Sequence, residues 1–311
     1  MRYTVFGRTG LRVSRVSMGC NRLGDPGVDP AYWPPLVKRA MELGVNLFDT
    51  ANSYNQGKSE TILGEATLDG PQPIYLATKV GASLAAGARW EDREFSAQTI
   101  LREVENSLKR LQRDTIDLYM LHGPSLEQLE NGDWAPAIQK LKDQGKIRFF
   151  GVSAEDHPSG IWALLHGADF LEIEYHLLDP TAEDDLLPLA KRFDIGIMVR
   201  MPLARGLLSG KFPAGQPLPP EQQWRRPKGA QLQRRLQRTE QLRFLEREGQ
   251  TLSQAAIRYV LSHPAVHCAI PGARTIAQLE ENVAAADADL TTAEIAHVHA
   301  LQDQWRQSGE W

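Results

Sequence analysis

The stretch Gly44-Val45-Asn46-Leu47-Phe48-Asp49-Thr50-Ala51-Asn52-Ser53-Tyr54 decides the fold of this chain, because a short apolar strand in it ends at ionisable residues. Lys79 closes the next apolar run, residues 74–78, and His122 follows the run 116–121. A carboxylate, a phenol, an ammonium and an imidazole therefore lie at the carboxyl ends of consecutive predicted strands. In a parallel α/β barrel those ends converge on one face, where the catalytic residues gather.

The rest of the chain continues this alternation. A hairpin is predicted first, with residues 3–6 and 11–14 on either side of a glycine-containing turn. Strands are then predicted at residues 15–19, 45–49, 74–79, 116–121, 147–153, 170–175, 195–200 and 266–270. Helices are predicted between and after them, at residues 32–43, 58–68, 96–111, 134–143, 159–166, 184–193, 252–262 and 276–286. Eight such units predict one (β/α)8 TIM barrel domain over residues 1–311, preceded by the hairpin.

A doubly wound sheet is the competing architecture. It would normally carry its glycine-rich dinucleotide turn after the first strand, but residues 18–24 lack that glycine spacing. The barrel is therefore preferred. Additional segments are expected over its carboxyl-end face: a loop at 211–230 that contains Trp224, a charged helix at 231–248, and a last helix at 292–306 before the tail.

Composition excludes several classes of protein. Of the 311 residues, 42% are hydrophobic and 24% are charged, which is typical of a soluble globular chain. The net charge of −4 gives no field that would attract nucleic acid, and no apolar run is long enough to span a bilayer. Cys20 and Cys268 are too few for a disulfide scaffold. These features, together with an N-terminus that lacks a signal-peptide core, predict a cytoplasmic protein.

Motifs along the chain resemble those of the aldo-keto reductase superfamily. They are the opening stretch 44–54, Ala77-Thr78-Lys79, residues 117–122, Gly151-Val152-Ser153, residues 202–211 and residues 270–274. The resemblance covers almost the whole chain, in matching order and in a matching strand–helix frame. It implies an enzyme that uses a nicotinamide dinucleotide to reduce a small aldehyde or ketone, or to oxidise the alcohol in the reverse direction.

The resemblance implies a catalytic tetrad of Asp49, Tyr54, Lys79 and His122. A carbonyl that accepts hydride becomes an alkoxide and needs a proton donor, but a free phenol has a pKa of ~10. A cation within reach stabilises the phenolate, and Lys79 is placed to lower the pKa of Tyr54 in this way. Asp49 would keep Lys79 charged and oriented, and His122 would orient the carbonyl. Taken singly, each of these residues could be structural; their joint position at strand ends favours catalysis.

The nicotinamide end of the cofactor is expected near Ser153, Glu172 and Arg200. Ser153 would hold the carboxamide, whereas Ala154 and Glu172 stand where the family commonly has Asn and Gln. A carboxylate accepts hydrogen bonds from the carboxamide but cannot donate to it. Arg200 replaces a common stacking aromatic. Arginine can stack on a ring, bind an anionic substrate group, or pair with Glu172, and cofactor contact is preferred.

The phosphate end is expected at two loops. The first loop would clasp the pyrophosphate with backbone amides and a lysine, and the second opens a helix whose N-terminus favours an anion. The residues implied by resemblance are Leu203, Gly206, Leu208, Ser209 and Lys211 in the first loop, and Gly272, Arg274, Gln278, Glu281 and Asn282 in the second. Arg274 resembles a residue that grips a 2′-phosphate, so NADPH is favoured, with NADH possible.

Other functions stay open at this stage. Glu172, Glu174 and His176 alternate along one strand and suggest a metal-dependent isomerase or hydrolase, but no metal is expected because the mouth of a barrel needs polar residues anyway. A nicotinamide-binding regulatory subunit of the same fold, with slow turnover and a partner chain, is the main alternative. The sequence does not define the substrate beyond a carbonyl compound or alcohol, nor the oligomeric state.

Overall fold

Eight parallel strands form the central sheet in the part of the chain that the computed structural model describes, residues 1–70, 73–82, 89–218 and 227–308. They are β3 (Met18–Gly19), β4 (Leu47–Asp49), β5 (Tyr75–Val80), β6 (Ile116–His122), β7 (Ile147–Ser153), β8 (Phe170–Glu174), β9 (Gly196–Arg200) and β10 (Cys268–Ala269). Each pairs with the next in chain order, and bridges from Val16 to Ala269 and from Gly19 to Gly272 join the last strand to the first. The predicted barrel is confirmed, and the doubly wound alternative is wrong.

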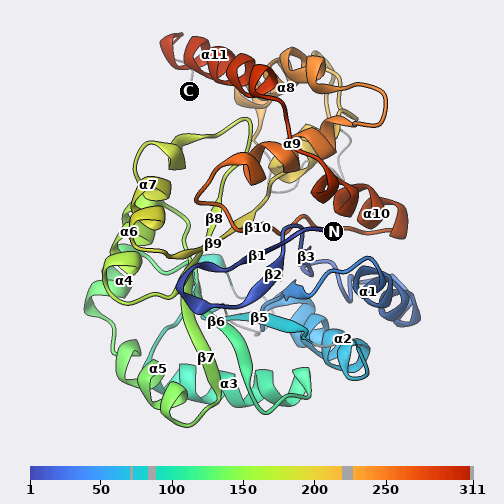
Figure 1. The fold of residues 1–311 in the computed structure, drawn as a ribbon. Coiled ribbons are helices and arrows are strands. Elements are labelled where there is room, and N and C mark those ends of the chain that lie inside the picture. Colours follow the sequence, from blue (N-terminus) through green and yellow to red (C-terminus); the bar gives the residue numbers. More distant parts are fainter. Residues whose placement is uncertain (71–72, 83–88, 219–226, 309–311) are drawn as a thin grey trace.

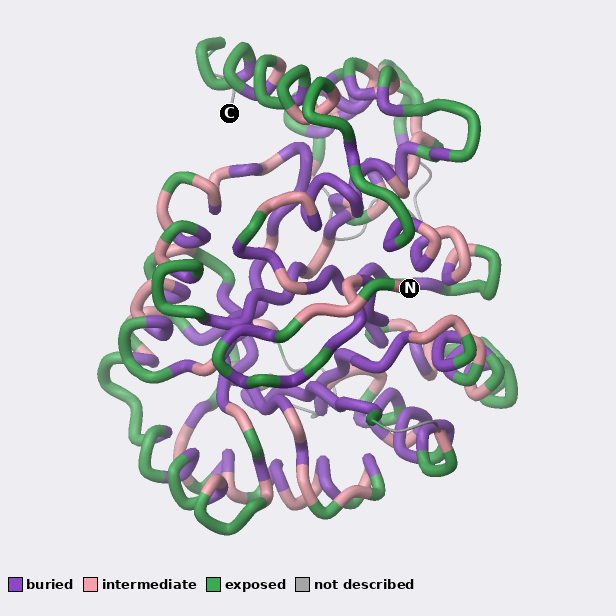
Figure 2. The backbone as a smooth tube through the Cα atoms, viewed as in Figure 1, coloured by how far each residue is buried: buried purple, intermediate pink, exposed green. Residues whose placement is uncertain are grey.

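Helices surround this barrel (Figure 1). They are α1 (Trp33–Glu42), α2 (Lys58–Thr67), α3 (Ala97–Leu111), α5 (Trp134–Asp143), α6 (His157–Leu165), α7 (Leu186–Arg192), α9 (Leu252–Ser262) and α10 (Ile276–Ala284). Most of these helices have a buried face and an exposed face, whereas α9 and the barrel strands are almost continuously buried (Figure 2). α10 packs beside α1 and so closes the outer ring.

The predicted hairpin is confirmed and covers the amino-end opening of the barrel. β1 (Tyr3–Val5) pairs antiparallel with β2 (Arg12–Ser14), and Phe6, Leu11 and Val13 are buried against residues that point into the barrel. The turn approaches the barrel so closely that a Cβ on Gly7 would lie 2.5 Å from the backbone nitrogen of Gly196. The glycine at position 7 allows this contact, with a φ of +48°.

The barrel interior is layered, and this layering positions the candidate site. Side chains alternate along a strand, so residues two apart point into the same space. The lower interior layer is apolar and contains Leu47, Ala77, Met120, Phe170 and Met198. Two residues further along the same five strands stand Asp49, Lys79, His122, Glu172 and Arg200. The polar candidates therefore form a ring above an apolar floor, at the carboxyl-end mouth.

Some segments outside the strand–helix alternation differ from those that the sequence predicts. A short helix that was not predicted, α4 (Leu126–Asn131), begins at a capping box formed by Ser125 and Gln128. The predicted charged helix is α8 (Gly229–Gln241), followed by a 3-10 turn at Leu242–Leu245. It lies beside the last helix, α11 (Thr292–Gln307), whose Trp305 donates a hydrogen bond to Gln241. Part of the predicted loop 211–230, with Trp224, and the end of the tail lie outside the described residues.

None of the helices within these described ranges combines the length and apolarity needed to cross a membrane.

Candidate active site

The centre of the mouth holds a buried ion pair. Lys79, on β5, donates from Nζ to Oδ1 of Asp49 at 2.5 Å and to the carbonyl oxygen of Thr50 at 2.9 Å. Asp49 and Lys79 are 3% and 0% exposed, so water screens this pair very little. Burial alone would lower the pKa of Lys79, but the charges of Asp49 and Glu172 outweigh it and raise the pKa. The two neighbouring carboxylates therefore favour the charged form of Lys79.

Tyr54 follows β4 in a tight turn beside this pair. The turn holds two residues with left-handed backbone, Asn55 at φ +50° and Gln56 at φ +58°. The Tyr54 ring centroid lies 5.2 Å from Nζ of Lys79. Burial and the charges of Asp49 and Glu172 raise the pKa of the phenol to about 12, although Lys79 acts to lower it. The expected effect of Lys79 is present, but the surrounding carboxylates and burial exceed it.

His122 ends β6 and faces the same space. Its ring lies edge-on to Tyr54, with centroids 5.8 Å apart, and edge-on to Trp90, with centroids 4.8 Å apart. It is 8% exposed. The four predicted tetrad residues are thus brought together at one end of the barrel, with an imidazole and a phenol side by side above a lysine.

Glu172 occupies a place that the sequence reasoning did not foresee. Its Oε1 accepts a hydrogen bond from Ser153 Oγ at 3.0 Å, and its Oε2 lies 3.1 Å from Lys79 Nζ. Asp49 and Glu172 therefore flank one ammonium group. Burial and the nearby Glu172 raise the pKa of Asp49 well above its usual value, against the lowering effect of Lys79.

Arg200, at the end of β9, pairs with Glu174 rather than with Glu172. Its Nη1 lies 3.2 Å from Glu174 Oε2, and its Nη2 donates to the carbonyl oxygen of Ala154 at 3.1 Å. The strand register explains this, because Glu174 stands opposite Arg200. Burial would raise the pKa of Glu174, but its contact with His176 and the charge of Arg200 lower it to about 2.

Glu172, Glu174 and His176, the residues considered as metal ligands from the sequence, contact different partners. Glu174 Oε1 lies 3.3 Å from His176 Nε2, while Glu172 turns toward Lys79. No grouping of three or more His, Cys, Asp or Glu side chains suited to a metal ion occurs in the described ranges.

The loop after β9 carries the first set of predicted phosphate contacts, and it is folded tightly. Residues Ala204–Ser209 form a 3-10 turn in which Arg205 and Gly206 have left-handed backbone. The amides of Gly206 and Leu208 donate to the carbonyl oxygen of Leu203, and the Ser209 hydroxyl donates to Gly206. These two amides are thus engaged within the loop, and Lys211 at its end is exposed.

The loop after β10 carries the second set. Gln278 accepts from the amide of Arg274 at 2.9 Å, and Asn282 donates to the carbonyl oxygen of Gly272 at 3.3 Å. Glu281 accepts from the Thr251 hydroxyl, which caps α9. Gln278 and Asn282 therefore shape the turn before α10. The Arg274 side chain is exposed at the start of this helix.

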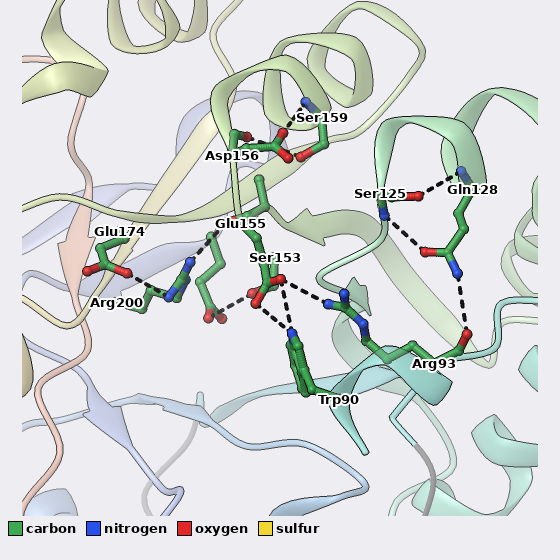
Figure 3. A network of polar contacts seen from close by, with 12 residues as sticks. Trp90, Arg93, Ser125, Gln128, Ser153, Glu155, Asp156, Ser159, Glu174 and Arg200 are labelled. Carbon is green, nitrogen blue, oxygen red and sulfur yellow. Dashed lines mark hydrogen bonds and ion pairs between the residues drawn. The ribbon is translucent and has the colours of Figure 1, made fainter. Parts of the chain in front are cut away.

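One wall of the mouth is built around Trp90. Its Nε1 donates to Glu155 Oε1 at 2.9 Å, and Arg93 Nη1 lies 3.2 Å from Glu155 Oε2 (Figure 3). The Arg93 guanidinium lies 4.3 Å from the Trp90 ring centroid. Glu155 was missed, although its position two residues after Ser153 at a strand end was a usable signal. The contacts with Glu155 and Arg93 hold the indole ring of Trp90 next to His122.

A (β/α)8 barrel that gathers an Asp, a Tyr, a Lys and a His at its carboxyl-end mouth has the features of a nicotinamide-dependent carbonyl oxidoreductase. Residues 15–303 match the family model described as the aldo/keto reductase family. The chain belongs to the aldo/keto reductase family and is an NAD(P)H-dependent oxidoreductase.

Proteins that are similar in sequence or in structure support this family assignment. The chain is 33% identical over 317 residues to the uncharacterized oxidoreductase YqkF of Bacillus subtilis, covering 99% of this chain and 97% of YqkF. It is similar to the holo form of aldo-keto reductase AKR11C1 from Bacillus halodurans, with a TM-score of 0.82, 32% identity and coverage of 97% and 96%. It is also similar to glycerol dehydrogenase AKR11B4 from Gluconobacter oxydans, with a TM-score of 0.83, 28% identity and coverage of 98% and 95%.

Proposed function

We propose that this enzyme reduces an aldehyde or ketone to an alcohol with NADPH, and that Tyr54 donates the proton. The observation that carries the proposal is the position of the Tyr54 ring, 5.2 Å from a buried Lys79 ammonium at the barrel mouth. A phenol beside a cation can form a phenolate and be protonated again, which a general acid requires. His122, edge-on to Tyr54, is placed to orient the carbonyl oxygen.

The residues of the mouth fit a nicotinamide dinucleotide phosphate. Bound there, the cofactor would supply the hydride, because no side chain can. Ser153, Glu172 and Arg200 surround the expected nicotinamide end. At the other end, the exposed guanidinium of Arg274 and the N-terminus of α10 suit the extra 2′-phosphate of NADPH. The phosphates between would meet Lys211, which is exposed in the loop after β9.

Residues of this chain supply the proton that the developing alkoxide takes up. As a C–H bond forms at the carbonyl carbon, the phenolic O–H of Tyr54 breaks and its proton passes to the developing alkoxide. Lys79 stabilises the phenolate that remains, and Asp49 holds Lys79 in place through its 2.5 Å contact. Alcohol oxidation uses the same groups in reverse, with the phenolate as base.

The test is a turnover assay. NADPH and NADH are added separately to the purified chain with a panel of aldehydes and ketones, and the absorbance of the reduced nicotinamide is followed. Glycerol and other small polyols with the oxidised cofactor cover the reverse direction, because the similar Gluconobacter protein is a glycerol dehydrogenase. Turnover that is lost in Tyr54→Phe supports the proposal. Tight NADPH binding without turnover on any substrate would instead favour the regulatory role, and inhibition by a chelator would favour a metal enzyme.

A further inference from the structure

Glu172 reaches across the barrel to the catalytic lysine. β8, which carries Glu172, and β5, which carries Lys79, are separated by β6 and β7 in the sheet. The 3.1 Å contact between Glu172 Oε2 and Lys79 Nζ therefore spans the interior of the barrel. Glu172 is 2% exposed and Lys79 is fully buried, so the contact is shielded from water.

The charges around this contact do not balance. Asp49 Oδ1 and Glu172 Oε2 lie 2.5 and 3.1 Å from the same ammonium. Within the described ranges, Lys79 is the only cation within 4.0 Å of either carboxylate. Two ionised carboxylates on one lysine would leave a buried unit of negative charge, which is costly, and a buried group of this kind takes up a proton instead.

The other groups that face this cluster make no ion pair with Asp49 or Glu172 in the part of the chain that the structure describes. Seen from each neighbouring element, they are Cys20 after β3, Tyr54 after β4, His122 on β6, Ser153 on β7, Arg200 on β9 and Cys268 on β10. Burial raises the pKa of both thiols, that of Cys268 to about 12, so both are neutral at pH 7. The charge of Arg200 is paired with Glu174.

We propose that Asp49 and Glu172 hold one proton between them at neutral pH, and that this proton sets the acidity of Tyr54. This inference rests on the proposed function, in which Tyr54 is the acid. With the proton in place, one carboxylate balances Lys79, and the phenolate adds the only unpaired negative charge. Without the proton, a phenolate would form beside an existing excess of negative charge and would be disfavoured. Glu172 acts through Lys79 and Tyr54 and is a positioning residue.

Glu172→Gln tests the proposal, because it keeps the shape and removes the second carboxylate. Because the parent already holds one proton on the pair, Glu172→Gln carries the same net charge around Lys79 as the parent does. The high-pH limb of carbonyl reduction, where Tyr54 loses its proton, should therefore stay within about half a unit of its position in the parent. If both carboxylates were ionised in the parent, removing one buried charge would move the limb to lower pH by about one unit or more. Glu172→Asp keeps both carboxyl groups and should also leave the limb near that of the parent. Glu174→Gln is the matched control on the same strand, and the limb should stay in place. A limb that moves to lower pH by about one unit or more in a folded Glu172→Gln variant overturns the proposal.

A second measurement needs neither cofactor nor turnover. The infrared C=O band of a protonated carboxyl group should be present in the parent protein at pH 7 and disappear at high pH. The band should be absent from Glu172→Gln at pH 7. A parent protein without the band overturns the shared proton, even if the variant does not fold. If the parent reduces no carbonyl compound, the proposed function fails, while the infrared titration still decides on the proton.

Discussion

Replacing Lys79 with Met removes the cation that Asp49 and Glu172 share. The methionine side chain has a similar volume, so packing is largely kept, and the main change is electrostatic. Breaking a buried pair by removing one partner typically costs about 3–5 kcal/mol. A domain of this kind is stable by only about 5–15 kcal/mol, so the free energy of unfolding at pH 8 should fall by roughly a fifth or more.

The loss should depend on pH in a defined direction. Burial already raises the pKa of Asp49 above the value of 3.8 for an exposed carboxyl, and without Lys79 nothing opposes that rise. The folded variant then binds more protons than the unfolded chain above pH ~4, so its stability falls as pH rises. Each extra bound proton changes the free energy of unfolding by about 1.4 kcal/mol per pH unit. Acidification from pH 8 to pH 5.5 should therefore restore much of the stability.

Urea unfolding followed by tryptophan fluorescence at both pH values measures this. Lys58→Met, at an exposed lysine on α2, is the matched control and should change little at either pH. Asp49→Asn combined with Lys79→Met should recover stability at pH 8, because one of the two buried carboxyls that contact Lys79 is gone. Equal losses for Lys79→Met at pH 8 and pH 5.5 would refute the electrostatic reasoning and leave only a packing defect.

Three further predictions concern the mouth. Tyr54→Phe should lower the rate of carbonyl reduction by at least ~10²-fold, as for loss of a general acid, with NADPH affinity retained in a fluorescence titration; unchanged turnover would remove Tyr54 from the mechanism. Arg274→Ala should weaken NADPH by about one to two decades, the size of a lost charge-assisted hydrogen bond of about 1.5–3 kcal/mol, and should leave NADH nearly unchanged. Equal losses for both cofactors would contradict a role at the 2′-phosphate. Glu155→Gln should loosen Trp90 over His122 and raise the KM for the carbonyl substrate more than it lowers kcat in steady-state kinetics; a change in kcat alone would argue against a substrate wall.

The sequence predicted the fold well because the signal is local. Apolar runs, helical spacing and turn residues each depend on neighbours along the chain, and a strand that ends in Asp49 or Lys79 identifies the mouth directly. The short helix α4 was missed because six residues give little periodicity, although Ser125 and Gln128 carry a capping-box pattern. The prediction of a single domain over residues 1–311 stays a prediction, as do the catalytic and cofactor roles of the site residues.

Contacts between side chains on opposite sides of the barrel could not be predicted from the sequence. The alternation along β8 places Glu172 inside, but the partner of an inward side chain depends on which strands face each other after closure. Glu172 consequently meets Lys79, three strands away, while Arg200 takes Glu174 as its partner through the register of β8 and β9. The pairing of Arg200 with Glu172, considered from the sequence, is therefore wrong.

The hairpin covers the amino-end opening of the barrel with apolar side chains. Phe6, Leu11 and Val13 cover the lower end, and the apolar layer around Met120 separates it from Lys79. Under the proposed function, in which Tyr54 is the acid, the proton that restores the phenol would come from the carboxyl-end side, where the substrate and the nicotinamide are also expected. Reprotonation of Tyr54 and exchange of substrate and cofactor would then share the same side of the barrel, so a slow release of product would also delay the recovery of the acid.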